Sequence, residues 1–263
     1  LLFSRQWDCL FGASGRFNKN RKWNKMKNLV FALSLLLTLP ALARDYFKVD
    51  FNDAKPEEKP AVQPYNRNTG STAPTKLSEL EPGLVKVIEK TATLTERPLL
   101  FNLGLSSSPA TELVFDGGNN LVTSGTVLID FDVEPVSYKP TSDGRIETAF
   151  SIRVTGNSGI DIASIVFAAT KPDSGAMALF PIGGPKVDLG SYELGKLYKF
   201  ALALDLTAGE LTVGINGEIR ADKVKINAAN AYRLLRFRSG QALGGRDGAL
   251  TVALDNIHIY DQQ

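Results

Sequence analysis

Three acidic side chains alternate with apolar ones in the segment Asp130-Phe131-Asp132-Val133-Glu134. Successive side chains of a β-strand point to opposite faces, so a strand here puts Asp130, Asp132 and Glu134 on one face. Glycoside hydrolysis uses paired carboxyl groups, and the retaining reaction needs them about 5–5.5 Å apart. The Cα atoms of positions i and i+4 in a flat strand are about 13 Å apart, so long side chains and a bulge must close the gap. In this hypothesis Asp130 is the nucleophile, Asp132 tunes it and Glu134 is the general acid/base. The alternative is a solvent-facing acidic stripe.

Arginines gather near the end of the chain. Arg236 and Arg238 alternate with apolar residues, so a strand places both guanidinium groups on one face. Arginine can hold the carboxylate of an acidic sugar through bidentate hydrogen bonds. A lyase acting on uronic acids would also use a Tyr or His base, and His258 is the only histidine. The alternative is a solvated basic edge. The whole group comprises Arg233, Arg236, Arg238 and Arg246, with Tyr232 beside them.

Short alternating segments separated by turn residues must position these side chains. Turn signals recur at Asp116-Gly117-Gly118-Asn119, Asp143-Gly144, Gly156-Asn157 and Asp247-Gly248. This rhythm is typical of a sandwich or jelly roll rather than of βαβ units. No segment predicts a helix, apart from a turn near 76–80. We expect strands at 45–52, 84–90, 99–103, 111–115, 125–134, 146–154, 160–169, 176–180 and 250–260, with Pro135 ending the fifth.

The clearest fold signal lies between Leu197 and Val224. Phe200, Leu202 and Leu204 follow a period of two, and Asn216-Gly217 predicts a type I′ hairpin turn. The run Gly195-Lys196-Leu197-Tyr198, Asp205, Gly209 and Val213 to Gly217 resembles the laminin-G-like, concanavalin A-like jelly-roll superfamily. The fold class that we predict is therefore all-β, a two-sheet antiparallel jelly-roll sandwich.

The resemblance has three implications for function. This architecture hosts lectins, glycosidases, lyases and adhesion modules, so the fold alone does not select an activity. Some glycosidases of this fold carry a Glu-x-Asp-x-Glu strand, and Asp130 stands where their first Glu would be. In similar carbohydrate-binding sandwiches an Asp of the closing strand is a Ca²⁺ ligand, and first and last strands usually lie side by side. The implied ligands are Asp50, Asn52, Asp53 and Asp255, and the alternative is that they satisfy nearby backbone groups.

The residues around Met26 to Ala43 predict a secretory signal peptide. A short basic start is followed by an apolar run from Leu29 to Leu39 and by Ala41-Leu42-Ala43, a small-x-small cleavage pattern. We therefore expect residues 1–25 to be an upstream extension, residues 26–43 a signal peptide, and residues 44–263 one secreted or periplasmic β-sandwich. The apolar run is too short for a membrane anchor. Residues 54–75, rich in Pro, are expected to form a loop or flexible linker.

Cutting after Ala43 changes the chemistry that is available. The removed part holds more basic than acidic residues, which more than accounts for the formal net charge of +2. The remaining chain is thus acidic, which disfavours nucleic-acid binding. Cys9, Trp7 and Trp23 are also removed, which excludes disulfides and thiol chemistry. The chain has no nucleophile-elbow, zinc-protease, phosphate-loop or dinucleotide motif.

These observations predict a secreted, non-catalytic carbohydrate-binding or cell-surface interaction domain, with Ca²⁺ as its candidate structural ion. The partner would be a polysaccharide, a cell-surface glycan or a protein. A ligand would lie on the concave sheet, where aromatic rings supply apolar platforms and arginines supply charge. The alternatives are a glycoside hydrolase using Asp130 and Glu134, or a structural surface protein with no small ligand. The expected platform residues are Tyr138, Tyr192, Tyr198 and Tyr232.

Overall fold

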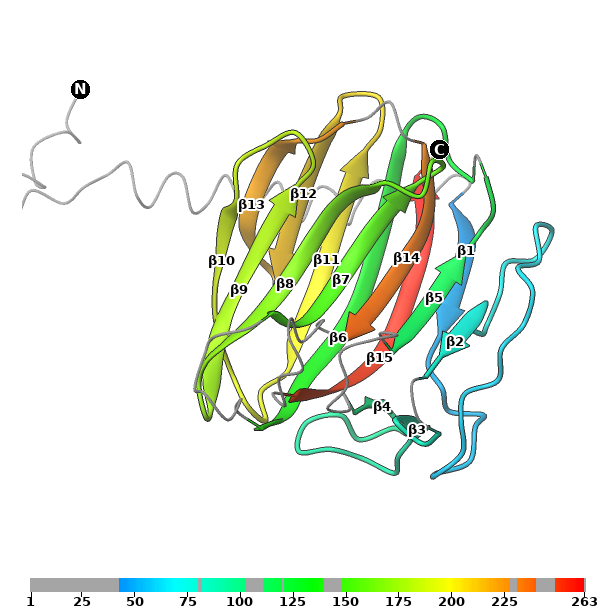
Figure 1. Ribbon diagram of the computed structural model, residues 1–263. Helices are drawn as coiled ribbons and strands as arrows, with labels where there is room; N and C mark the ends of the chain where they lie inside the picture. Colours follow the sequence, from blue (N-terminus) through cyan, green and yellow to red (C-terminus); the bar gives the residue numbers. More distant parts are fainter. Residues whose placement is uncertain are drawn as a thin grey trace, which may run out of the picture. The chain divides into compact units, whose positions relative to one another are not determined.

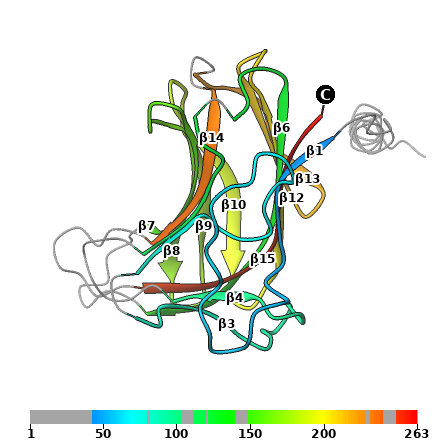
Figure 2. The ribbon, with the colours of Figure 1, turned by 90° about the vertical axis from the view of Figure 1, so that its right-hand side faces the viewer.

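Two antiparallel sheets packed face to face form the part of the chain that the computed structural model describes (Figure 2). The described residues are 43–79, 82–102, 111–119, 121–139, 148–227, 231–239 and 249–262. The predicted upstream extension and nearly all of the predicted signal peptide lie outside them, as does Arg246. Every regular element of the described residues is a strand, and none of these residues lies in a helix able to cross a membrane. This architecture confirms the predicted all-β sandwich.

The first sheet, sheet A, has eight strands. They are β1 (Arg44–Val49), β3 (Val85–Val87), β4 (Leu99–Phe101), β6 (Thr126–Lys139), β11 (Tyr198–Asp205), β12 (Glu210–Ile215), β13 (Glu218–Lys225) and β15 (Ala249–Gln262). Their order is β13-β12-β11-β6-β15-β4-β3, with β1 also paired to β15 (Figure 1). The first and last strands therefore lie side by side, as expected.

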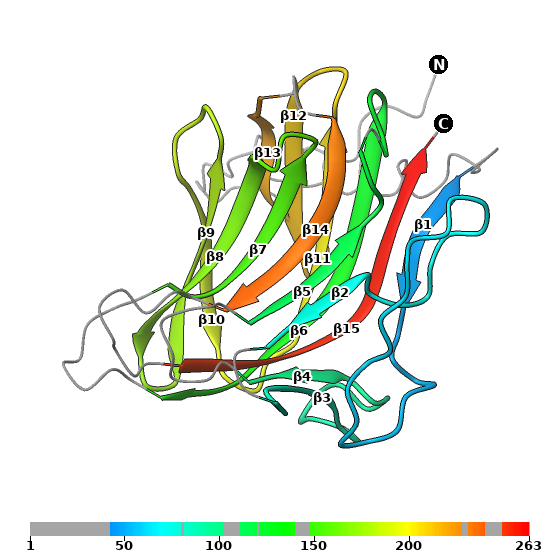
Figure 3. The same ribbon diagram turned by 45° about the vertical axis from the view of Figure 1, so that its right-hand side comes forward.

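The second sheet, sheet B, has seven strands. They are β2 (Lys76–Ser78), β5 (Glu112–Asp116), β7 (Thr148–Gly156), β8 (Asp161–Lys171), β9 (Ser174–Pro181), β10 (Val187–Glu193) and β14 (Tyr232–Ser239). Their order is β10-β9-β8-β7-β14-β5-β2. Strands β7, β8 and β14 are clearly bent along their length (Figure 3).

A cluster of phenylalanines joins the two sheets. Phe237 of β14 packs edge-on against Phe131 of β6 and Phe115 of β5, with ring centroids 5.4 and 6.0 Å away. Phe131 in turn stacks on Phe200 of β11 at 5.0 Å. All four rings are at most 2% exposed. Edge-to-face and offset-stacked geometries favour such aromatic pairs beyond the area that they bury.

The β12–β13 hairpin follows the sequence prediction closely. Asn216 and Gly217 both have positive φ, 52° and 77°, as a type I′ turn requires. The side-chain amide group of Asn216 also holds the turn against β11, because its Oδ1 accepts a 2.8 Å hydrogen bond from Lys199 N.

Strand β6 continues past Pro135, where the sequence predicted its end. Val133 is the last residue of β6 paired with β11, opposite Tyr198. Pro135 therefore lies beyond that ladder, and its carbonyl accepts a 2.7 Å hydrogen bond from Gly195 N. Since the missing N–H of Pro135 faces the same side, the strand continues without losing a ladder bond.

The Pro-rich segment 54–75 is packed onto the sandwich. Ser71 N donates to Tyr46 O of β1 at 2.9 Å, and Thr75 N donates to Val114 O of β5 at 2.8 Å. Earlier in the segment, the ring of Tyr65 packs against the core. The segment therefore bridges an edge of sheet A and an edge of sheet B, and it is not a free linker.

The aromatic cluster makes Phe237 a test of the fold. Phe237→Ala should lower the free energy of unfolding by about 3–5 kcal/mol, because it leaves a cavity where β5, β6, β7 and β14 meet. Urea denaturation followed by circular dichroism measures this loss. Phe180→Ala is the matched control, since Phe180 is 39% exposed, and it should cost under about 1 kcal/mol. Equal losses in both variants would contradict the role of Phe237.

Candidate functional site

The three acidic side chains of β6 lie on the outer face of sheet A, opposite buried Ile129 and Val133. They do not form a solvent-facing stripe. Asp132 is 7% exposed and Glu134 is 1% exposed. Asp132 Oδ2 accepts a 3.0 Å hydrogen bond from Asn256 Nδ2. Both carboxylates are therefore covered by neighbouring parts of the chain.

Glu134 is held by the loop that follows β3. Its Oε2 accepts hydrogen bonds from the hydroxyl groups of Thr91 and Thr93 and a 3.1 Å bond from Thr93 N. Burial acts to raise the pKa of Glu134, but these hydrogen bonds outweigh it and lower the pKa. A general acid needs an accessible carboxyl group with a raised pKa. The geometry of Glu134 is instead that of an anchor for the loop.

A chain of polar contacts surrounds Asp130. Tyr260 donates its hydroxyl proton to Asp130 Oδ2 at 3.1 Å, and the ring of Tyr260 stacks on His258 at 4.2 Å between centroids. His258 Nε2 lies 2.8 Å from Asp45 Oδ1. Burial, followed by the charge of Asp130, raises the pKa of Tyr260, so the phenol keeps its proton. Tyr260 therefore cannot serve as a base while it is bound to Asp130.

The residues predicted to hold Ca²⁺ are only partly brought together. Asp255 is 3% exposed and lies opposite Asp132 in the β15–β6 pairing, but Asp50 and Asp53 are exposed after β1. The backbone oxygen of Asn52 accepts a 2.8 Å hydrogen bond from Arg97. Among the described residues, no group of three or more His, Cys, Asp or Glu side chains is placed to hold a metal ion. The calcium site stays a prediction, to be tested by metal addition.

The tyrosines expected to stack on sugars belong mostly to the core. Tyr192 and Tyr232 are completely buried, and Tyr198 is 9% exposed with its hydroxyl accepting a 2.8 Å bond from Glu193 N. Tyr138 is partly buried against the same core. The sequence missed this because Tyr192 and Tyr232 lie on inward-facing positions of β10 and β14. Neither of these two rings can serve as a platform on a sheet surface.

The predicted arginines lie together on the outer face of sheet B. Arg236 and Arg238 flank inward-facing Phe237 on β14, and Arg153 of β7 is the cross-strand neighbour of Arg236. Two carboxylates pair with these arginines. Glu112 Oε1 lies 3.1 Å from Arg238 Nε and 3.7 Å from Arg236, and Asp161 Oδ2 lies 3.0 Å from Arg153.

These guanidinium groups keep unused hydrogen-bonding capacity. The Nε groups of Arg236 and Arg238 are buried, and neither is aligned for a hydrogen bond, although Arg238 Nε is close to Glu112. Burial lowers the pKa of Arg238, and so do the positive charges of Arg153 and Arg236. Glu112 is thus the carboxylate partner of both Arg236 and Arg238. The positive charge of Arg153 repels these two arginines. An external anion would relieve that repulsion.

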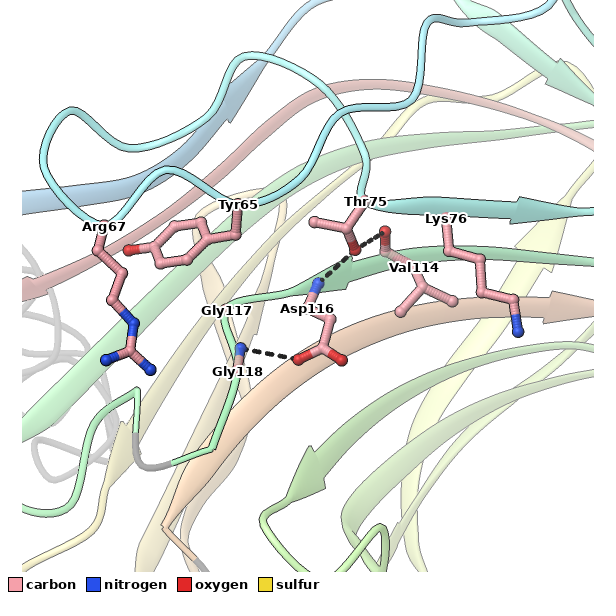
Figure 4. Close-up of a pocket in the computed structure, with 8 residues that line it drawn as sticks. All are labelled: Tyr65, Arg67, Thr75, Lys76, Val114, Asp116, Gly117 and Gly118. Carbon is pink, nitrogen blue, oxygen red and sulfur yellow. Dashed lines mark hydrogen bonds between the residues drawn. The ribbon is translucent and has the colours of Figure 1, made fainter.

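A pocket of about 500 Å³ lies at the β2–β5 edge of the same sheet (Figure 4). Sequence reasoning missed it, because its residues come from the Pro-rich segment and from a glycine turn far apart in the chain. The signal that could have found it is the pair of cations beside an aromatic residue at 65–76. The pocket is lined by Tyr65, Arg67, Thr75, Lys76, Val114, Asp116, Gly117 and Gly118.

His258 and the arginine cluster do not meet. His258 lies on the outer face of sheet A, whereas Arg236 and Arg238 lie on the outer face of sheet B. The core between the sheets separates them. The structure therefore does not assemble a lyase site from His258 and these arginines.

No protein-family model and no curated sequence matches the chain. The solved structure of alginate lyase AlyC3 matches 82% of this chain and 89% of its own, with a TM-score of 0.50 and 10% identity. A marine PL7 alginate lyase, AlyA1 from Zobellia galactanivorans, matches 69% of this chain and 82% of its own, with a TM-score of 0.49 and 14% identity. A sialidase matches 70% of this chain but 17% of its own length, with a TM-score of 0.47 and 14% identity. At 10% identity the similarity to AlyC3 concerns the fold alone.

These similarities contradict the sequence-based prediction of a non-catalytic carbohydrate-binding or cell-surface interaction domain. The solved structure that matches with a TM-score of 0.50, AlyC3, is named as an alginate lyase. The burial of Tyr192 and Tyr232 also removes two of the aromatic platforms on which that prediction depended.

Glu134 should prove structural. Glu134→Gln should lower the free energy of unfolding by about 1–3 kcal/mol at pH 7, because an amide cannot accept all the bonds that the carboxylate accepts. A lowered pKa stabilises the fold above the ordinary glutamate pKa of 4.5 and loses that effect as the pH falls. The difference in melting temperature between variant and wild type should therefore shrink towards about pH 3. An unchanged melting temperature with all cleavage lost would point instead to a catalytic Glu134.

Asp255 should destabilise the protein when it ionises. Burial, together with the charges of Asp132, Asp50 and Glu96, raises its pKa from 3.8 to about 7. The unfolded chain ionises first, so stability falls as the pH rises from about 4 to 7. Asp255→Asn lacks this titration, and its advantage in melting temperature over wild type should grow between pH 4 and pH 8 in the presence of a chelator.

The same two proteins also test the predicted calcium site. Adding Ca²⁺ at pH 8 should leave both melting temperatures unchanged, since the described donors do not form a calcium set. A rise in wild type that Asp255→Asn lacks would contradict this and establish Asp255 as a ligand.

Proposed function

We propose that this protein is a carbohydrate-active enzyme that cleaves an acidic polysaccharide bound across the outer face of sheet B. The observation that carries the proposal is a row of cations at right angles to the strands. Lys76 of β2 pairs with Val114 of β5, Val114 pairs with Arg236 of β14, and Arg236 pairs with Arg153 of β7. Val114 is apolar, and the three others are cationic.

The spacing of the row suits a polymer rather than a single small anion. Neighbouring strands are about 4.8 Å apart, so the backbone positions of Lys76 and Arg153 are about 14 Å apart. A chain of sugars lying along the row would present one carboxylate after another to these cations. Arg238 adds a further guanidinium group beside Arg236. The planar guanidinium group of arginine binds a carboxylate through two parallel hydrogen bonds, and a neutral sugar has no carboxylate to accept them.

The chemistry of cleavage agrees with this placement. Pairing a uronate carboxylate with a guanidinium group offsets the negative charge that develops when the neighbouring carbon loses a proton. Eliminative cleavage of a uronic acid polymer requires this charge stabilisation, together with a base that takes the proton from carbon and an acid that protonates the leaving oxygen. The arginines of this face supply the charge stabilisation. The fold match to alginate lyase AlyC3 supports the same class of substrate. Export is part of the proposal, because the predicted signal peptide would bring the enzyme to polymers outside the cytoplasm.

The test is a cleavage assay of the whole protein on alginate, polygalacturonate and neutral glucans. Reducing ends report any cleavage, and ultraviolet absorption by a new conjugated double bond reports elimination. Cleavage of an acidic polymer with both signals supports a lyase. Reducing ends without that absorption indicate a hydrolase. Cleavage of neutral glucans alone, or of no polymer, contradicts the proposal.

Arg236→Ala and Arg153→Ala should each raise KM for the acidic polymer about 10- to 100-fold, the equivalent of one lost charge-assisted hydrogen-bond pair. Arg236→Lys should recover only part of the loss, because lysine keeps the charge but lacks the planar guanidinium group. Lys48→Ala is the control, since Lys48 is exposed on β1 of sheet A. Melting temperatures verify that each variant is folded. Full activity in both arginine variants would place the site elsewhere.

A further inference from the structure

We propose that the pocket lined by Tyr65, Arg67, Lys76 and Gly118 is a separate subsite that binds one uronate residue at the end of the row. The inference rests on the proposed function only for the polymer that the residue belongs to. It assigns a role to the Pro-rich segment 54–75, which supplies Tyr65 and Arg67.

Position connects the pocket to the cationic row. Lys76 lines the pocket and is also the first cation of the row, through its pairing with Val114. Val114 lines the pocket as well and pairs with Arg236. A sugar chain that follows the row past Arg236 therefore arrives at the pocket.

The charge of the pocket selects an anion. Arg67 and Lys76 are exposed, and neither forms an ion pair with a carboxylate of the described residues. The carboxylate of Asp116, which also lines the pocket, is already hydrogen-bonded to other residues of the chain. It accepts bonds of 3.0 and 2.8 Å from Arg233 and of 2.8 Å from Gly118 N.

Asp116 therefore does not cancel the positive charge of the pocket. Burial acts to raise its pKa, but the bonds from Arg233 and Gly118 outweigh burial and lower the pKa. The carboxylate stays ionised and paired with Arg233. Arg67 and Lys76 are left to bind a negative group from outside.

The shape and lining of the pocket suit one sugar. Its volume of about 500 Å³ lies within the range of small-molecule sites. Tyr65 packs one side of its ring on Phe47 at 5.1 Å, and Figure 4 shows the ring beside Arg67, across from Gly117 and Gly118. An aromatic ring with a few polar groups is the usual composition of a sugar site.

Gly118 lies close to Arg67 at a turn whose backbone conformation favours glycine. Its φ of +85° suits glycine, and a Cβ there would lie 3.5 Å from Arg67 Nη2. Arg67 is also fixed at its backbone, because its carbonyl accepts a hydrogen bond from Arg44 Nη2. Substituting the Arg67 side chain leaves that backbone contact in place, so the variant tests binding rather than folding.

The experiment measures binding of glucuronate to the whole protein by NMR titration, with glucose as the neutral comparison. Glucuronate should bind and glucose should bind more weakly. Arg67→Ala and Tyr65→Ala should each weaken glucuronate binding at least about tenfold. Lys48→Ala, which changes neither the row nor the pocket, should leave glucuronate binding unchanged.

Cleavage separates failure of the subsite from failure of the proposed function. Arg67→Ala should raise KM for a short oligouronate and leave kcat on long polymer within about twofold, because long chains retain the contacts of the row. Glucuronate binding that is equal in wild type, Arg67→Ala and Tyr65→Ala overturns the subsite, even if polymer is cleaved. Binding lost in these variants without cleavage of any acidic polymer keeps the subsite and overturns the proposed function.

Discussion

The alternation of side chains along β6, β14 and β15 decides on which outer face Asp130, His258 and Arg236 lie. The inward-facing side chains of these strands fill one core, built around Phe131 and Phe237, because two sheets are stable only when their apolar faces are buried together. The remaining side chains of each strand must then point away from the core. Asp130 and His258 face away from the core on sheet A, and Arg236 faces away from it on sheet B. The two outer faces therefore carry different chemistry, acids with one histidine on sheet A and arginines on sheet B.

The outer face of sheet A is largely satisfied by its own chain. Glu134 binds the loop after β3, Asp132 binds Asn256, and Asp130 binds Tyr260. Sheet B differs because one glutamate, Glu112, serves two guanidinium groups and leaves buried donors unaligned. Three arginines share two carboxylates on this face, and the proposed function assigns the excess positive charge to an anionic ligand.

Much of the fold could be predicted from local sequence, because local rules determine it. The turn at Asn216-Gly217 needs positive φ at both residues, and the pairing of first and last strands follows from the resemblance. The site could not be predicted in the same way. The burial of Tyr232 depends on which face of β14 turns inward, and the covering of Glu134 depends on how a loop packs. The segment 54–75 resembled a linker in composition, yet its hydrogen bonds to β1 and β5 hold it where Tyr65 and Lys76 line one pocket.

The arginines on the outer face of sheet B are hard to explain by a purely structural role. An isolated surface ion pair contributes little to stability, about 0–1 kcal/mol, and like charges on neighbouring strands work against it. Arg236 and Arg153 are direct cross-strand neighbours, and Arg238 lies two residues along the same strand. A sheet that needed only solubility would gain more from mixed charges at these positions. The repulsion is consistent with a partner that arrives from outside and carries its negative charges in a row.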